Sequence, residues 1–79
     1  MKIAVQLFGP LAEQAGVSRL EVTVSQATVG DVVAAAAAAK PALRIDRSVR
    51  FALNTDYAPP SAPVREGDVV SLIPPVGGG

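Results

Sequence analysis

The residues with the clearest chemical use stand at the end of the sequence, where the glycines Gly77–Gly79 follow Val76 and the pair Pro74–Pro75. A terminal glycine has no side chain to shield its carboxyl group, so a second protein can reach the carbonyl carbon from any side. Glycines also let the backbone enter a narrow channel, at an ordering cost of roughly 0.5–1 kcal/mol per residue. Fully extended, Val76–Gly79 would reach about 13 Å beyond Pro75. We therefore expect the carboxyl group of Gly79 to be the working group of this chain.

The residues before Gly79 have expected roles of their own. Gly77 and Gly78 keep the tail thin, while Pro74, Pro75 and Val76 direct it, since prolines reduce the entropy that a segment loses when it becomes ordered in a partner. The alternative is that the glycines are a frayed end or the remnant of a fusion. Their position directly after an apolar strand pattern and a stiff Pro-Pro favours a functional tail.

The chemistry of a terminal carboxyl group sets what else is needed. Its ordinary pKa is about 3.3–3.7, so at neutral pH it is an anion and a poor electrophile. Another protein must therefore attach a good leaving group to it. The sequence has no cysteine and no histidine, which excludes disulfides, zinc sites and Cys- or His-based nucleophilic catalysis on this chain. If sulfur is handled here, it is carried on something other than a side-chain thiol.

The composition limits which kinds of partner and location this protein can have. The 79 residues suffice for one small domain, and seven basic and seven acidic residues give a formal net charge of zero. There is no basic stripe for nucleic acid and no polybasic segment for a membrane surface. The longest strongly apolar stretch, 32–39, is too short to span a bilayer, and Met1-Lys2 leads into a strand pattern and not into a signal peptide. We expect a soluble, cytoplasmic protein.

Periodicity predicts an α+β domain. Apolar residues alternate over 3–8, 20–25, 49–53 and 69–73, which predicts four strands, the first two forming an antiparallel hairpin. Pro10 opens a short helix over 11–15 and Gly16 ends it. The main helix is predicted from Thr28 to Lys40, with Thr28 as N-cap and six consecutive alanines. With the first and last strands adjacent, this order is a ubiquitin-like β-grasp of four to five strands on one main helix, spanning 1–75, with 76–79 as a tail.

Two further segments raise the question of whether they bind a partner protein. Pro60 and Pro63 match a PxxP ligand pattern within 58–63, but no basic residue flanks them, which favours a surface loop. The last strand is apolar on both faces, with Val70 and Leu72 on one side and Val69 and Ile73 on the other. Such a strand is normally central and covered on both faces. With only one substantial helix, a partner protein is a candidate cover for the second face.

Over nearly its whole length the chain resembles the small subunit of molybdopterin synthase, a ubiquitin-like sulfur carrier. The resemblance rests on Phe8, Leu11, Glu13 and Gly16, on Thr28–Asp31, Pro41–Leu43 and Ala52–Asn54, and most specifically on Gly67–Val76 followed by Gly78–Gly79. Ala12 stands where the family usually has arginine, Val33 and alanines replace leucines of the main helix, and Gly77 replaces a more usual serine. The Val-Gly-Gly-Gly ending also occurs in thiamine-pathway sulfur carriers, which are typically shorter and lack the Pro-Pro.

The resemblance implies a reaction sequence that other proteins carry out. A ubiquitin-activating-type adenylyltransferase uses ATP and Mg²⁺ to form an acyl-adenylate on Gly79, and a sulfur donor protein then displaces AMP to leave a thiocarboxylate. The sulfur passes to cyclic pyranopterin monophosphate to form molybdopterin, with the catalytic side chains on the large subunit in a heterotetramer. The chain itself is then a carrier and not an enzyme, and it binds no cofactor or metal.

The same resemblance suggests a surface for the partner. The candidates for a partner-facing apolar patch are Phe8, Phe51, Leu53, Leu72 and Ile73. Plain core packing is the alternative for each, because each also lies on a predicted strand face. Rival functions are a sulfur carrier for thiamine, tRNA thiolation or cysteine synthesis, a ubiquitin-like modifier whose Gly79 joins lysines of other proteins, and a purely structural domain.

Overall fold

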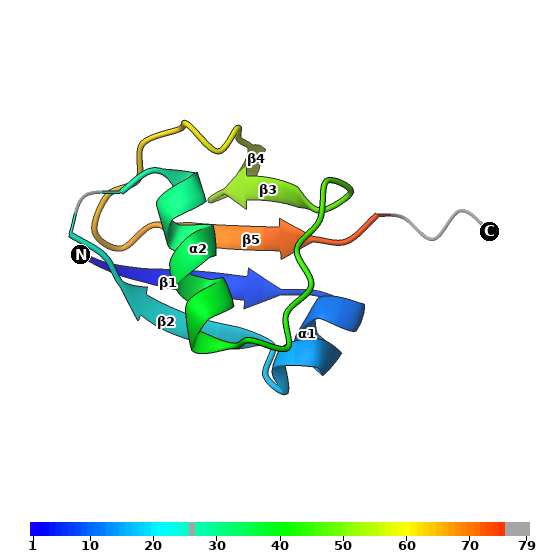
Figure 1. The fold of residues 1–79 in the computed structure, drawn as a ribbon. Coiled ribbons are helices and arrows are strands. Elements are labelled where there is room, and N and C mark those ends of the chain that lie inside the picture. The colour runs from blue at the N-terminus through cyan, green and yellow to red at the C-terminus, as the bar shows by residue number, and fades with distance from the viewer. Residues whose placement is uncertain (26, 76–79) are drawn as a thin grey trace.

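The computed structural model describes residues 1–25 and 27–75, which form one mixed sheet with two helices (Figure 1). In chain order the elements are β1 (Lys2–Leu7), α1 (Pro10–Ala15), β2 (Arg19–Thr23), α2 (Val29–Ala39), β3 (Arg50–Leu53), β4 (Asp56–Tyr57) and β5 (Val69–Ile73). The sheet order is β2-β1-β5-β3-β4. The predicted ubiquitin-like β-grasp is confirmed. The short strand β4 was not predicted.

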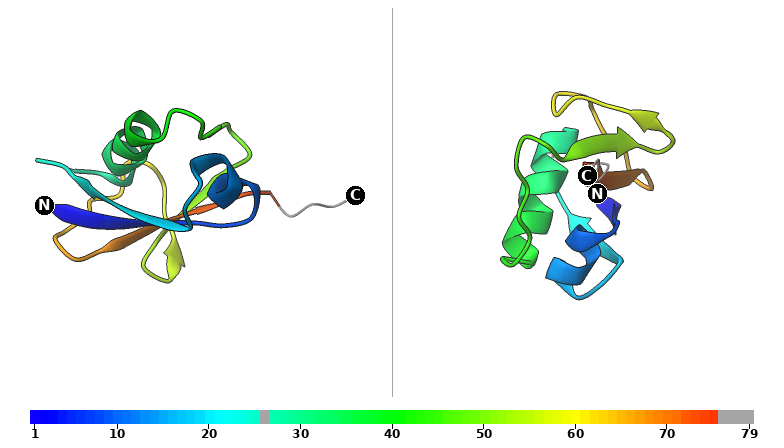
Figure 2. Two further views of the ribbon diagram at one scale, coloured as in Figure 1. Left: turned by 90° about the horizontal axis from the view of Figure 1, so that it is seen from below. Right: turned by 90° about the vertical axis from the view of Figure 1, so that its right-hand side faces the viewer.

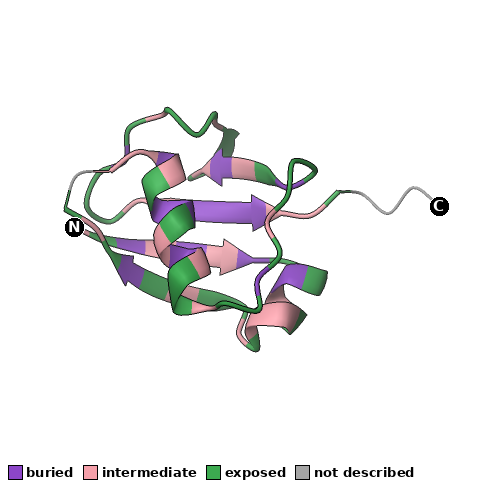
Figure 3. Ribbon diagram, in the orientation of Figure 1, coloured by how far each residue is buried: buried purple, intermediate pink, exposed green. Residues whose placement is uncertain are grey.

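The centre of the sheet is β5, which lies between β1 and β3. It pairs with β1 in parallel, Val5 opposite Val70 and Leu7 opposite Leu72, and with β3 antiparallel. The predicted β1–β2 hairpin is antiparallel as expected. Because β5 has a strand on each side and α2 over one face, its middle is buried, as Figure 3 shows.

The core lies between α2 and one face of the sheet. Seen edge-on in Figure 2, α2 covers a single face, and α1 sits at the end of the sheet where β1 finishes. The helix contributes Val29, Val32, Val33 and Ala36 to this core. Ala36 has no exposed surface, which shows how close the helix backbone lies to the strands. Small side chains on α2 therefore give a shallow core.

The start of α2 is fixed by a reciprocal pair of hydrogen bonds. The Asp31 amide donates to the Thr28 hydroxyl at 3.3 Å, and the Thr28 amide donates to the Asp31 carboxylate at 3.0 Å. The amide of the N-cap residue and one free amide in the first turn of the helix are thus each bonded to a side chain, which is the capping box. The predicted N-cap is confirmed.

The proline-rich segment 58–63 is held against the same end of α2. The Val29 amide donates to the Ala62 carbonyl at 2.8 Å, and the Gly30 amide donates to the Pro60 carbonyl at 2.9 Å. A Cβ on Gly30 would lie 3.3 Å from that carbonyl oxygen, so glycine permits the close approach. Apart from a single bridge between Thr28 and Pro63, the segment has no regular structure, which fits the loop interpretation and not that of a free PxxP ligand.

One of the five candidate interface residues belongs to the core. Leu72 has no exposed surface, because it lies in the central strand beneath α2, between Leu7 and Phe51. It cannot form part of an exposed apolar patch, and the core-packing alternative applies to it. Phe8, by contrast, is 47% exposed.

We predict that Thr28→Ala lowers the free energy of unfolding by about 1 kcal/mol, because the Asp31 amide loses its acceptor. Equilibrium urea denaturation measures the change. Thr55→Ala, at an exposed turn, is the matched control and should leave the midpoint almost unchanged. Equal losses in the two variants would contradict the capping role.

We also predict that Leu72→Ala and Phe8→Ala differ sharply in stability. Truncating the fully buried Leu72 should cost about 2–5 kcal/mol through lost burial and a residual cavity. Truncating the half-exposed Phe8 should cost about 1 kcal/mol or less. The same urea denaturation decides, and comparable losses would show that Phe8 is a core residue after all.

Candidate functional site

The candidate site begins where β5 leaves the sheet. Beyond Ile73, Pro74 is partly buried and Pro75 is exposed. The expected working residue Gly79, together with Val76 and Gly77–Gly78, lies outside the described residues. The site that the structure does describe is thus the base of the predicted tail, at the end of the sheet where the parallel strands β1 and β5 both finish (Figure 1).

A tight turn between β1 and α1 lies beside this base. Gly9 has φ 53°, a left-handed conformation that favours glycine, and its carbonyl accepts the Ala12 amide at 3.1 Å. A Cβ on Gly9 would lie 3.6 Å from Cγ of Pro74, so the turn and the proline are near neighbours. The turn and the fixed φ of Pro74 together restrict the direction in which the chain leaves the sheet.

The sheet register divides the candidate interface residues between two faces. Phe51 and Leu53 lie opposite Leu72 and Val70, so they share the face that α2 covers and pack against the core. Ile73 lies one position along from Leu72 and faces the other side. Phe8 follows the buried Leu7 just beyond the end of β1 and is exposed. The predicted patch is therefore not one surface, and the candidates that remain are Ile73 on the face without a helix and the exposed Phe8 beside it.

Residues that the sequence analysis did not select complete this face. A shallow hollow at the base of the tail is lined by Ile73 and Pro74–Pro75 together with Ser48, Arg50 and Tyr57. Tyr57 is 74% exposed and belongs to β4, which pairs with β3 opposite Ala52. The sequence does contain one indication of the turn between β3 and β4, namely Asn54, which has a φ of 57° there. Asparagine is one of the few residues that adopt this conformation, and so it marks hairpin turns.

The middle of the helix-free face is built from small side chains and one longer polar one. The small residues are Ala4 on β1, Ser71 on β5 and Ala52 on β3, and the polar one is Gln6 on β1; all four alternate with the core residues of their strands. The Ser71 hydroxyl lies 3.4 Å from the Gln6 side-chain oxygen, and both Ser71 and Ala52 are buried by their neighbours. A face of mostly small side chains, with the exposed aromatic residues Phe8 beyond the end of β1 and Tyr57 on the edge strand β4, suits close approach by a partner.

Charges are distributed unevenly between the two ends of the sheet. The end that holds the base of the tail carries Arg19, Arg44, Arg47 and Arg50 against Glu13 and Asp46. The opposite end carries Asp56, Glu66 and Asp68 against Lys2 and Arg65. Among the side chains named here, basic ones outnumber acidic ones at the tail end, and acidic ones outnumber basic ones at the other end, where the ammonium group of Met1 also lies.

A short loop before β3 holds its carboxylate in place. Asp46 accepts a hydrogen bond from the Ser48 hydroxyl and a second from the Ser48 amide at 2.8 Å. These bonds lower the pKa of Asp46 below its ordinary value, the hydroxyl being the larger cause. The charged form is thus favoured in the folded state. Its contribution to stability is present above the ordinary pKa and is lost as the pH falls through the lowered value.

The site has the character of a docking surface. Among residues 1–25 and 27–75, no three acidic side chains gather in a way that could hold a metal ion. Within the same residues no helix is long and apolar enough to cross a membrane. The side chains around the base of the tail offer apolar contact and positive charge, which are suited to binding.

We predict that Ser48→Ala raises the pKa of Asp46 towards its ordinary value of 3.8, because the hydrogen bond from the Ser48 hydroxyl, which lowers this pKa most, is lost. An NMR titration of the Asp46 carboxyl carbon measures this. Ser61→Ala, in another exposed loop, is the control and should leave the Asp46 titration unchanged. An identical titration in the wild type and Ser48→Ala would rule out the proposed cause.

Comparison with known proteins gives a consistent result. A model of the ThiS family matches residues 5–79, a range that includes the terminal glycines. The molybdopterin synthase sulfur carrier subunit of Chlamydomonas reinhardtii is 36% identical over 83 residues, covering 100% of both chains.

Solved structures agree with this assignment. The small archaeal modifier protein SAMP1 of Haloferax volcanii has a TM-score of 0.91 at 31% identity, covering 100% of both chains. One chain of a complex between subunits 1 and 2 of molybdopterin-converting factor from Helicobacter pylori has a TM-score of 0.73 at 28% identity, again over 100% of both chains. On the family match and these full-length likenesses, the chain belongs to the ThiS family of ubiquitin-like sulfur carriers.

Proposed function

We propose that this protein is the sulfur carrier of molybdenum cofactor biosynthesis and acts as the small subunit of molybdopterin synthase. The carboxyl group of Gly79 is adenylated by a ubiquitin-activating-type enzyme with ATP and Mg²⁺. A sulfur donor replaces AMP, leaving a thiocarboxylate. The large subunit then catalyses sulfur transfer from Gly79 to cyclic pyranopterin monophosphate, and the carrier is a co-substrate of that reaction.

The observation that carries the proposal is the full-length likeness to a molybdopterin synthase sulfur carrier subunit, which is 36% identical. The family match also extends through Gly79, which supports a role for the terminal glycines. The Helicobacter pylori structure, a complex of subunits 1 and 2, supports a large subunit as partner.

The described residues suit this division of labour. Phe8, Ile73 and Tyr57 offer apolar contact around the base of the tail, and Arg50 adds a positive charge there. A large subunit that binds this surface holds the start of the tail still. The rigid pair Pro74–Pro75 then limits how much entropy is lost when the tail enters the partner's active site.

A ubiquitin-like modifier is the second candidate. The TM-score of 0.91 and 31% identity to the archaeal modifier SAMP1 favour it. In that function the activated Gly79 joins a lysine amine of another protein and no sulfur is transferred. Peptides that carry Gly-Gly on lysine, found by mass spectrometry in the native cell, would support it.

We predict that deletion of Gly79, or addition of one residue after it, abolishes molybdopterin formation while the fold is retained. The assay combines the carrier, its activating enzyme, a sulfur donor, the large subunit and cyclic pyranopterin monophosphate. Intact mass reports the thiocarboxylate as one oxygen replaced by sulfur, and urea denaturation reports the fold.

Thr55→Ala, at the end of the sheet opposite the base of the tail, is the control and should form molybdopterin at the wild-type rate. Molybdopterin formation by the shortened chain would overturn the role of Gly79. If the wild type becomes thiocarboxylated but yields no molybdopterin, the protein is still a sulfur carrier. Its sulfur acceptor would then belong to thiamine synthesis, tRNA thiolation or cysteine synthesis.

A further inference from the structure

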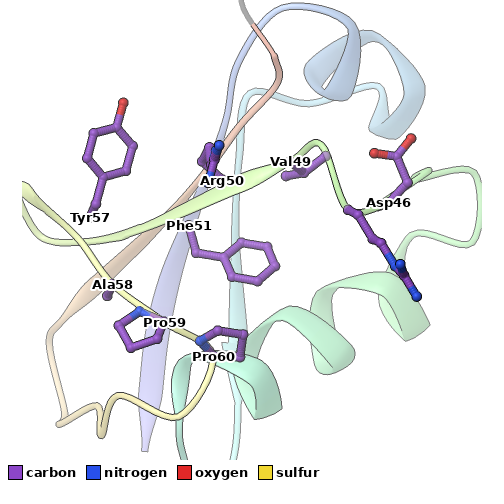
Figure 4. Close-up of a pocket in the computed structure, with 9 residues that line it drawn as sticks. Asp46, Val49, Arg50, Phe51, Tyr57, Ala58, Pro59 and Pro60 are labelled. Carbon is purple, nitrogen blue, oxygen red and sulfur yellow. The ribbon is translucent and has the colours of Figure 1, made fainter.

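A groove of about 680 Å³ opens beside β3, and the proposed carrier function makes no use of its inner part. Figure 4 shows Phe51 on the side of β3 that faces α2, with Tyr57 projecting the opposite way. The groove exists because β4 has only two residues and pairs with Ala52 and Leu53 alone. The first half of β3 is left without a neighbouring strand on its outer side.

The inner surface of the groove is apolar and fixed in position. Phe51 is partly exposed there, beside Val49, Ala58 and the pair Pro59–Pro60. Phe51 and Pro60 both line the groove and are labelled in Figure 4. The Ala58 amide donates to the Phe51 carbonyl at 3.0 Å, and the Pro60 carbonyl accepts the Gly30 amide at 2.9 Å. The proline wall is thus tied to β3 on one side and to α2 on the other, so the groove is formed before anything binds.

The rim of the groove is positively charged. Arg47 and Arg50 line it, and within residues 1–25 and 27–75 arginines enter hydrogen bonds through backbone atoms only, as Arg44 and Arg65 do. The one carboxylate on the rim, Asp46, is bound to Ser48 of its own loop. Two guanidinium groups beside an apolar floor are complementary to a ligand that combines an apolar side chain with negative charge.

We propose that this groove binds an extended acidic segment of a partner protein. An apolar side chain of that segment lies against Phe51 and Pro60, and flanking carboxylates face Arg47 and Arg50. A peptide is favoured because the lining of Phe, Val, Ala and Pro suits aliphatic side chains, and because the groove lies beside the half of β3 that has no neighbouring strand on its outer side. The inner part of the groove, at Val49 and Phe51, lies on the α2 side of the sheet. Arg50 lies opposite Ile73 and also lines the hollow at the base of the tail, so Arg47 is the charge that belongs to the groove alone.

The test titrates the full-length ¹⁵N-labelled protein with synthetic peptides. The probe is acetyl-Asp-Glu-Leu-Ile-Glu-Asp-amide. Its two controls replace the four acidic residues with lysine or replace Leu-Ile with Ser-Ser. We expect the acidic probe to shift the amide signals of Phe51, Ala58 and Arg47, and either control to bind at least about fivefold more weakly. Raising the salt from about 0.05 to about 0.5 M should weaken the acidic probe as well, since exposed charges are screened.

Matched charge reversals locate the binding. Arg47→Glu should weaken the acidic probe by about three- to tenfold, because one attraction becomes a repulsion. Arg44→Glu changes the charge by the same amount in the same loop but outside the groove, and should alter binding by less than about twofold. Pro60→Ala tests the apolar wall and should also weaken the probe.

Three results would each overturn the proposal: no shifts with the acidic probe, equal binding of the lysine control, or shifts confined to the helix-free face around Phe8 and Ile73. Because Arg47 lies outside the hollow at the base of the tail, Arg47→Glu also separates this groove from the carrier function. Loss of probe binding with sulfur transfer intact supports the groove, and failure of sulfur transfer in the wild type leaves the groove unaffected.

Discussion

The parallel pairing of β1 with β5 is the constraint on which the rest of this molecule depends. It joins Ala4 to Val69 and Leu7 to Leu72, which are more than sixty residues apart in the sequence, so its formation requires the closure of a long loop and a loss of chain entropy. The pairing places β5 at the centre of the sheet, with a neighbouring strand on each side. The same pairing brings the turn at Gly9 to Pro74, so the first and last parts of the chain together form the base of the tail.

Around this pairing, the two faces of the sheet have different uses. The face under α2 is filled by the core, whose depth is set by valines and Ala36. The other face keeps small residues at its centre, such as Ala52 and Ser71, with exposed aromatic side chains at its flanks. Under the proposed carrier function, this helix-free face, held in place by the central strand, is the surface that suits docking by a partner protein.

The sequence predicted the elements better than their orientation. Alternation located four strands, and Thr28 with Asp31 marked the start of α2, because these signals are local. Alternation does not reveal which face of the sheet α2 covers. The predicted partner-facing patch therefore includes both Leu72, which is buried, and Phe8, which is exposed. The two-residue strand β4 has too few positions for a period to show. The groove beside β3 arises from a loop far along the chain, which only tertiary contacts place there.

The end of the sheet where β5 finishes carries four arginine side chains, those of Arg19, Arg44, Arg47 and Arg50. An acidic partner that approaches this end is attracted over about 8–10 Å, the range within which salt screens exposed charges only in part. Such attraction makes encounters that begin near Pro74 more frequent, and it adds less to the strength of the final complex.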